Sequence, residues 1–168
     1  MCIRDSFRTS AQYLSTSITS VNEDVAATRT TYLLTVTLLE NGTQNVHTLF
    51  GTPDSPMTIP PAFQTDNAVA GADIGGVSPD LLESTPESQF DSWLSVGLTA
   101  GNNGEISSSG IDFSGWGPND GLVVVNGEVS WVDPLAGPTG AEIVVGQLTV
   151  PTGSDFTATV NLLSLIHI

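Results

Sequence analysis

The sequence predicts an all-β fold, an antiparallel β-sandwich with about seven or eight strands. Apolar and polar residues alternate with a period of two along several short segments, and turns rich in Gly, Pro and Asn separate these segments. Helical periodicity is confined to 79–84, a stretch that starts with Pro79 and ends before Pro86.

The first half of the chain contains three predicted strands. Segments 14–20 and 32–39 alternate apolar and polar residues, as half-buried strands do. Asn41-Gly42 follows, a pair that favours a two-residue turn. We therefore expect segment 45–51 to return as the second strand of a hairpin.

The second half contains a middle strand at 92–99 and a second predicted hairpin. Segment 122–125 leads into Asn126-Gly127, and segment 128–131 leads out of it. Asn-Gly suits a type I′ turn, because that turn needs positive φ at both central residues. We expect these two segments to pair with each other.

Two further strands are predicted near the C-terminal end, on either side of a turn at 151–155. In the first strand, Val144, Leu148 and Val150 share one face. In the second strand, the residues expected to face the core are Phe156, Ala158 and Val160. Together with the earlier segments, these strands favour a jelly-roll or an immunoglobulin/cohesin-like sandwich.

A long irregular segment, 51–89, interrupts the strand pattern and holds six of the ten prolines. Loops of this length are uncommon inside compact domains unless they pack on the domain or have a function. Scattered apolar residues such as Phe63 and Ile74 predict a long excursion that lies over one sheet. The alternative is two pieces joined near 52–90.

The composition points to an exported protein and away from two partner classes. The net charge is −15 and all three basic residues are Arg, so there is no basic patch to bind nucleic acid or an anionic membrane. No apolar run is long enough to insert into a membrane. The uncharged, Thr-rich polar residues suit strands and are common on extracellular or cell-surface proteins.

The two ends of the chain are expected to be foreign to the protein. MCIRDS (1–6) and LSLIHI (163–168) resemble the translation of a transposon mosaic end and of its reverse complement, the DNA used to attach sequencing adapters. The single β-sandwich domain is then expected to span 7–162. Cys2, the only cysteine, lies in the first hexamer, which leaves no disulfide to stabilise the fold.

The sequence shows no recognisable combination of catalytic residues, so we expect that the protein is not an enzyme. Without the second hexamer, His47 is the only imidazole, and it lies in a predicted strand, where we expect it on the solvent face. There is no Gly-x-Ser-x-Gly motif. A pair of carboxylates for glycoside hydrolysis needs a cleft of defined width, which a sequence cannot show.

Structural calcium is the one cofactor that the residue types favour, because calcium takes carboxylate and carbonyl oxygens from loops. The preferred candidate ligands lie in the segment GIDFSGWGPNDG and are Asp112, Asn119 and Asp120. Two other loops supply the sets Asn102, Asn103, Glu105 and Asp66, Asp73, Asp80. None has the spacing of an EF-hand, and Asn, Asp and Gly also occur in turns for backbone reasons alone.

One aromatic residue is a candidate for ligand contact. Trp93 and Trp131 lie in predicted strands and are expected in the core. Trp116 lies in the loop Gly115-Trp116-Gly117, where an exposed ring could stack on a sugar. The alternative is that Trp116 covers an edge of the core.

The segment from Phe90 to Leu162 carries a resemblance. Its strings FDSWLSVGLT, GLVVVNGEVSWVDP and GAEIVVGQLTVP resemble β-rich modules in large secreted or surface proteins of marine microbes and algae. It is also distantly similar to cohesin-type sandwiches. The resemblance brings no catalytic or binding residues. The strand pattern, the lack of Lys, of Cys within 7–162 and of a catalytic His arrangement, and the acidic surface with its uncharged polar residues predict a non-catalytic structural or adhesive module, with neighbouring modules or an extracellular polysaccharide as partners. The alternative is a carbohydrate-binding module of a secreted enzyme.

Overall fold

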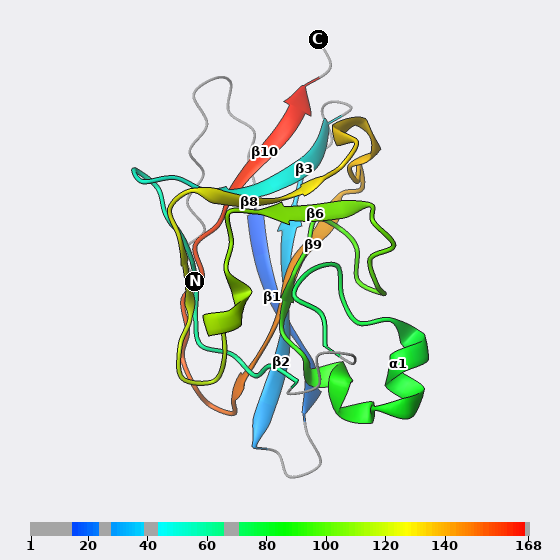
Figure 1. Ribbon diagram of the computed structural model, residues 1–168, viewed down its shortest axis with the longest axis vertical. Helices are drawn as coiled ribbons and strands as arrows, with labels where there is room; N and C mark the ends of the chain where they lie inside the picture. Colours follow the sequence, from blue (N-terminus) through cyan, green and yellow to red (C-terminus); the bar gives the residue numbers. More distant parts are fainter. Residues whose placement is uncertain (1–14, 24–27, 39–43, 66–70, 167–168) are drawn as a thin grey trace.

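The computed structural model describes residues 15–23, 28–38, 44–65 and 71–166 of the chain (Figure 1). Ten strands, all in antiparallel sheets, account for most of its regular structure, and α1 (Pro79–Ser84) is its one α-helix. The predicted all-β sandwich-like fold is therefore confirmed. No helix among the described residues is long and apolar enough to cross a membrane.

Two four-stranded sheets and one small sheet make up the fold. Sheet A has the order β1 (Ser15–Glu23), β2 (Arg29–Thr37), β9 (Glu142–Pro151) and β5 (Trp93–Leu94). Sheet B has the order β10 (Asn161–Ile166), β3 (Gln44–Gly51), β8 (Gly127–Trp131) and β6 (Ile106–Ser109). The small sheet C pairs β4 (Met57–Ile59) with β7 (Leu122–Val124). Three short 3₁₀ helices complete the elements: η1 (Pro86–Phe90), η2 (Phe113–Gly115) and η3 (Pro134–Ala136).

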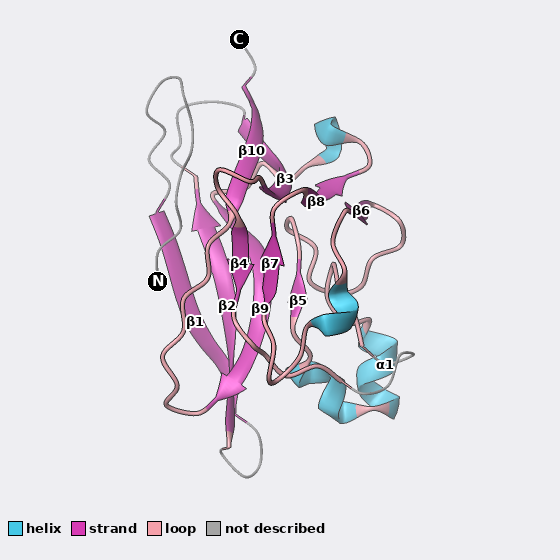
Figure 2. Cartoon of the chain, turned by 60° about the vertical axis from the view of Figure 1, so that its left-hand side comes forward, coloured by secondary structure: helices cyan, strands magenta, loops and turns pink. Residues whose placement is uncertain are grey.

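The sheets are arranged crosswise around one core. In Figure 1, β8 and β6 run across the direction of β1 and β2, and Figure 2 shows β1, β2 and β9 side by side along the long axis. All three sheets contribute fully buried side chains to the core, among them Leu34 and Leu148 from sheet A, Leu49 and Val129 from sheet B, and Met57 from sheet C. Burial of this shared apolar surface is the main force that holds the sheets together.

Both predicted hairpins are wrong. β2 belongs to sheet A and β3 to sheet B, so they do not pair, and the Asn41-Gly42 turn lies outside the described residues. Likewise, β7 pairs with β4, whereas β8 pairs with β3 and β6. The φ of Gly127 is not positive, so Asn126-Gly127 is no type I′ turn. In both places the chain passes from one sheet to another.

Gly127 is needed for a different reason, the close approach of two backbones. A Cβ added to Gly127 would lie 2.6 Å from the main-chain oxygen of Gly110. Gly110 in turn has a φ of +68°, and its own added Cβ would lie 2.3 Å from the main-chain oxygen of Asn126. Only glycine fits at both positions without moving the backbone.

β-Bulges explain where the simple alternation fails. The register of β3 against β10 skips His47, so Val46 and Leu49 both point into the core although they are three residues apart. The register of β9 against β2 skips Val145 in the same way. Val145 is therefore fully buried, while Val144, predicted to face the core with Leu148, is only half-buried.

The last strand begins later in the structure than the sequence predicts. Ala158 and Val160 are buried and Phe156 is half-buried, as predicted, but this segment makes only a single bridge, Thr159 to Thr58. The regular strand starts later, at Asn161, and β10 continues to Ile166. Its pairing with β3 through 163–166 uses main-chain groups, which any residue other than proline supplies.

The irregular segment lies along one side of sheet A. Within it, β4 and α1 form, and α1 has the predicted bounds. The main-chain N–H of Phe63 donates to the oxygen of Thr149 on β9, and Ile74 forms a parallel bridge with Leu94 on β5. Main-chain hydrogen bonds therefore attach the segment to β9 and β5 of sheet A. Figure 2 shows α1 beyond β5 on that side.

Candidate functional site

Trp116 does not lie where a ligand could stack on it. Its side chain is 4 % exposed and packs in the core cluster, with the Phe113 ring centroid 6.3 Å from its own. The indole Nε1 donates to the main-chain oxygen of Pro60 at 3.0 Å. The prediction of Trp116 as a ligand contact is therefore corrected: the ring covers the core. Trp93 is buried, as predicted, and Trp131 is half-buried and donates to the oxygen of Val96.

The preferred calcium ligands have local roles in a turn. The Asp112 carboxylate accepts from both the main-chain N–H and the hydroxyl of Ser114, at the start of η2. These two hydrogen bonds lower the pKa of Asp112. The main-chain oxygen of Asp120 accepts from the N–H of Gly117, and Asn119 is exposed. These interactions account for the turn without a metal.

The other two candidate loops are also held by their own hydrogen bonds or fall partly outside the described residues. Asn102 accepts from the N–H groups of Gly104 and Ile106, and Glu105 accepts from the N–H of Asn103. Asp66 is not among the described residues, and Asp80 lies in the first turn of α1. Within the described ranges, no three His, Cys, Asp or Glu side chains come together as metal ligands.

His47 is buried, not on the solvent face as predicted. Because His47 is the bulged residue of β3, its side chain is covered by the loop after η3, where a Cβ added to Gly137 would lie 3.2 Å from the Cβ of His47. Its Nδ1 lies 2.8 Å from the hydroxyl of Thr48. Burial lowers the pKa of His47, and the Glu128 carboxylate raises it by less. The imidazole is therefore neutral at neutral pH.

A buried carboxylate, Asp91, holds the two ends of the 65–72 segment. One oxygen accepts from the N–H of Thr65 at 2.8 Å, and the other accepts from the N–H of Ala72 at 2.6 Å. Only 1 % of Asp91 is exposed. Burial raises its pKa, Asp73 adds to that effect, and the two N–H donors oppose it. Gln147 completes the cluster by donating to the main-chain oxygens of Asp91 and Gln89.

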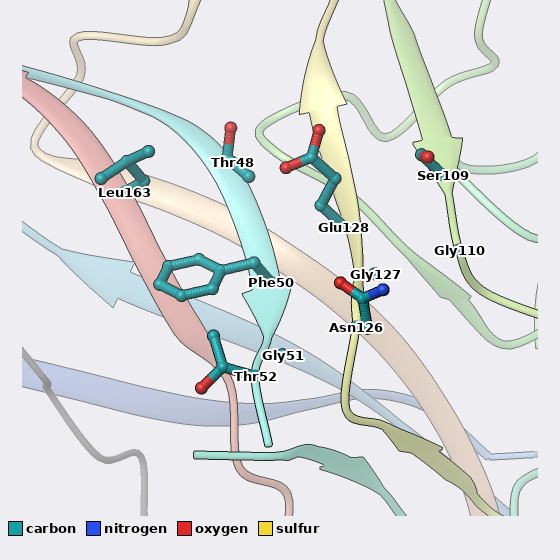
Figure 3. Close-up of a pocket in the computed structure, with 10 residues that line it drawn as sticks. All are labelled: Thr48, Phe50, Gly51, Thr52, Ser109, Gly110, Asn126, Gly127, Glu128 and Leu163. Atoms are coloured by element: carbon teal, nitrogen blue, oxygen red, sulfur yellow. The ribbon is translucent and has the colours of Figure 1, made fainter. Parts of the chain in front are cut away.

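A groove of about 400 Å³ opens on sheet B (Figure 3). Strands β3 and β8 supply Phe50 and Glu128, which are paired across the two strands and so lie on the same face. Ser109 on β6 is paired with Glu128 and lies in the same row. The remaining lining residues are Thr48, Gly51, Thr52, Gly110, Asn126, Gly127 and Leu163.

The groove is chemically simple. Glu128 is the only ionisable side chain among its lining residues, and it is exposed. Phe50 is half-buried, and Figure 3 shows its ring over β10, next to Leu163 and on the side of β3 away from Glu128. Hydroxyl and amide groups surround them. The arrangement offers an apolar ring, one fixed negative charge and several neutral hydrogen-bonding groups.

The sequence does not predict this groove. Phe50 lies near the end of one predicted strand, and Glu128 follows a predicted turn. Pairing of β3 with β8 brings these residues together, whereas the sequence pattern predicts that 128–131 pairs with 122–125. Glu128 and Ser130 alternate with Val129 along β8, which predicts a solvent face for that strand, but the bulge at His47 breaks the alternation in β3.

Three comparisons with known proteins found no match for this chain. No family model matches it, no curated protein matches it significantly, and no solved structure does. The function is therefore inferred from the groove, the buried polar groups and the composition.

Proposed function

We propose that this chain is a non-catalytic β-sandwich module of a larger secreted or surface protein, with a structural or adhesive role outside the cell. The observation that carries the proposal is the groove on sheet B, which offers a binding surface with a single carboxylate. Hydrolysis of a glycosidic bond by the usual mechanisms needs two carboxylates facing each other across the scissile bond. A single carboxylate and an aromatic ring that line the same groove suit binding instead.

Two buried side chains, His47 and Asp91, are of types that act as general bases in enzymes, and their surroundings also support this proposal. The His47 imidazole faces Thr48, and the Asp91 carboxylate is occupied by main-chain N–H groups of its own chain. A general base must reach the proton that it takes from a substrate. Asp91 instead holds residues of the irregular segment, and His47 lies buried in β3.

A second candidate, a carbohydrate-binding module of a secreted enzyme, is favoured by the same groove. The two candidates share the binding step and differ in what the neighbouring part of the longer protein does. The acidic composition and the resemblance to marine surface modules favour the adhesive role.

The test couples the whole chain to beads and measures both adhesion and turnover. We expect the beads to be retained on surfaces coated with extracellular polysaccharide, and we expect no release of reducing ends from any polysaccharide in solution. Release of sugar that increases with time, and that is lost in Glu128→Gln, would show an enzyme and contradict the proposal.

A further inference from the structure

We infer that the groove on sheet B binds a neutral polysaccharide, with one pyranose ring stacked on Phe50 and hydroxyl groups of the polymer donating to Glu128. The inference rests on the proposed non-catalytic role, because the sugar is bound and released unchanged. It adds the site, the contacting residues and the chemical class of the ligand.

Phe50 provides the stacking surface. It lies on β3 between β10 and β8, with Asn161 and Glu128 as its cross-strand partners. Asn161 is buried and donates to the main-chain oxygens of Phe50 and Ser55, which fixes the backbone beneath the ring. An aromatic face attracts the C–H groups of a sugar by dispersion and by removing apolar area from water. A ring on a fixed strand loses little conformational freedom when it binds.

Glu128 provides the polar side of the site. Its carboxylate is exposed, and Ser130 Oγ lies 3.4 Å from Oε1, at the long limit of a hydrogen bond. An ionised carboxylate has about four acceptor positions and no donor, which suits a ligand rich in hydroxyl donors. Ser109 and Asn126 extend the hydrogen-bonding surface along the same groove.

Charge decides between neutral and anionic polysaccharides. The chain carries a net charge of −15, and the one ionisable group in the groove is an acid. Sulfated or uronate-rich chains would place like charges beside Glu128, which is unfavourable and is screened only by salt. A neutral hexose polymer meets no such repulsion.

Two glycines contribute to the lining of the groove. Gly110 on the β6 side and Gly127 on β8 approach so closely that neither position has room for a Cβ. Their main chains therefore line the groove without side chains that could fill it.

Titration calorimetry of the whole chain with soluble neutral β-glucan, mannan and galactan, and with alginate and a sulfated galactan, tests the inference. We expect at least one neutral polymer to bind and the anionic polymers to bind more weakly. Phe50→Leu keeps an apolar side chain but removes the ring, and we expect it to raise Kd by about tenfold or more. Glu128→Gln should raise Kd by several-fold.

One matched variant serves as the control. Val123→Ala changes a side chain that is 71 % exposed and lies outside the groove, and it should leave Kd unchanged.

Several results would overturn the inference. Binding to no neutral polymer would do so, as would tighter binding of the anionic polymers or an unchanged Kd in Phe50→Leu. Self-association that is lost in Phe50→Leu, without glycan binding, would assign the groove to a second copy of the chain. If the polysaccharide binds and is also cleaved, that result would contradict the non-catalytic role but would not contradict the binding site.

Discussion

The indole Nε1 of Trp116 donates a hydrogen bond to the main-chain oxygen of Pro60 at 3.0 Å, across a long separation in sequence. This bond ties the η2 loop to the residues that follow β4 and places the ring in the core. An aromatic residue between two glycines in a loop has the appearance of a ligand contact, yet here it closes the core. The groove over Phe50 and Glu128 lies away from this loop, on sheet B.

We expect Trp116→Phe to destabilise the fold without changing polysaccharide binding. The shorter side chain leaves the Pro60 oxygen without its donor and leaves part of the indole volume empty, at a cost of about 1 to 3 kcal/mol. Chemical denaturation measures the free energy of unfolding, and calorimetry measures Kd. A raised Kd with unchanged stability would instead indicate that Trp116 contacts the ligand.

We expect Asp91→Asn to destabilise the fold by about 2 to 3 kcal/mol, because an amide can accept from only one of the two N–H donors and turns its own donors toward the other. Denaturant unfolding of the variant measures this loss. Glu87→Gln, at an exposed position of η1, is the matched control and should change stability by only a few tenths of a kcal/mol. Equal stability in the two variants would show that Asp91 does not hold the 65–72 segment.

The pKa of Asp91 predicts a pH dependence of defined sign. Burial raises this pKa above the ordinary 3.8, so between 3.8 and the raised pKa the folded state binds more protons than the unfolded state. Stability contributed by this group therefore falls as pH rises through that window, and it stays constant above it. Burial raises the pKa of Asp73 as well, so Asp91→Asn should reduce the slope without abolishing it.

Denaturation midpoints at closely spaced pH values measure this slope for the unsubstituted chain and for Asp91→Asn. Asp112 acts in the opposite direction but only below 3.8, since its pKa is lowered, and it does not interfere in this window. Parallel stability curves for the two proteins above pH 4 would contradict the assignment.

Gly127→Ala should be strongly destabilising, because its Cβ would lie 2.6 Å from the backbone oxygen of Gly110 and two strands would have to separate. We expect a cost of about 1 to 3 kcal/mol, as for other overpacked sites. In Gly115→Ala, the added Cβ meets nothing within 4 Å, so this variant serves as the control and should be nearly neutral. Thermal unfolding compares the two. Similar melting temperatures would mean that the β6–β8 contact is loose.

Asp112→Asn distinguishes a helix cap from a calcium ligand. As a cap, Oδ1 accepts from Ser114 whether or not calcium is present, and the amide oxygen of Asn can accept the same two hydrogen bonds, so we expect the variant to leave the melting temperature nearly unchanged in calcium and in chelator alike. A metal bound only to the folded state would raise the melting temperature of the unsubstituted chain in calcium. A calcium-dependent rise that Asp112→Asn removes would restore Asp112, Asn119 and Asp120 as a metal site.

Local sequence signals predicted the elements that depend on local chemistry. Pro79 at the first helical turn and Pro86 beyond the end define α1, and alternation along 32–39 identifies most of β2. Both features act within a few residues, through the fixed φ of proline and the two-residue period of a strand. The all-β class follows from the same short-range patterns.

Strand partners and the site could not be predicted in the same way. Asn126-Gly127 has the composition of a hairpin turn, but Leu122 and Val124 find their apolar partners in β4, and Val129 packs in the core from sheet B. Burial of these side chains outweighs the preference of a two-residue turn. The groove depends on the pairing of β3 with β8, so neither strand alone could reveal it.

The most direct test of the groove is an NMR titration of the whole chain with a short neutral oligosaccharide taken from a polymer that binds. We expect amide and side-chain shifts at Thr48, Phe50, Glu128 and Ser109, with ring-current shifts on the sugar protons that face Phe50, and no change at the Trp116 indole N–H. Shifts that cluster around Trp116 or the η2 loop, with the Phe50 and Glu128 signals unmoved, would contradict the groove as the binding site.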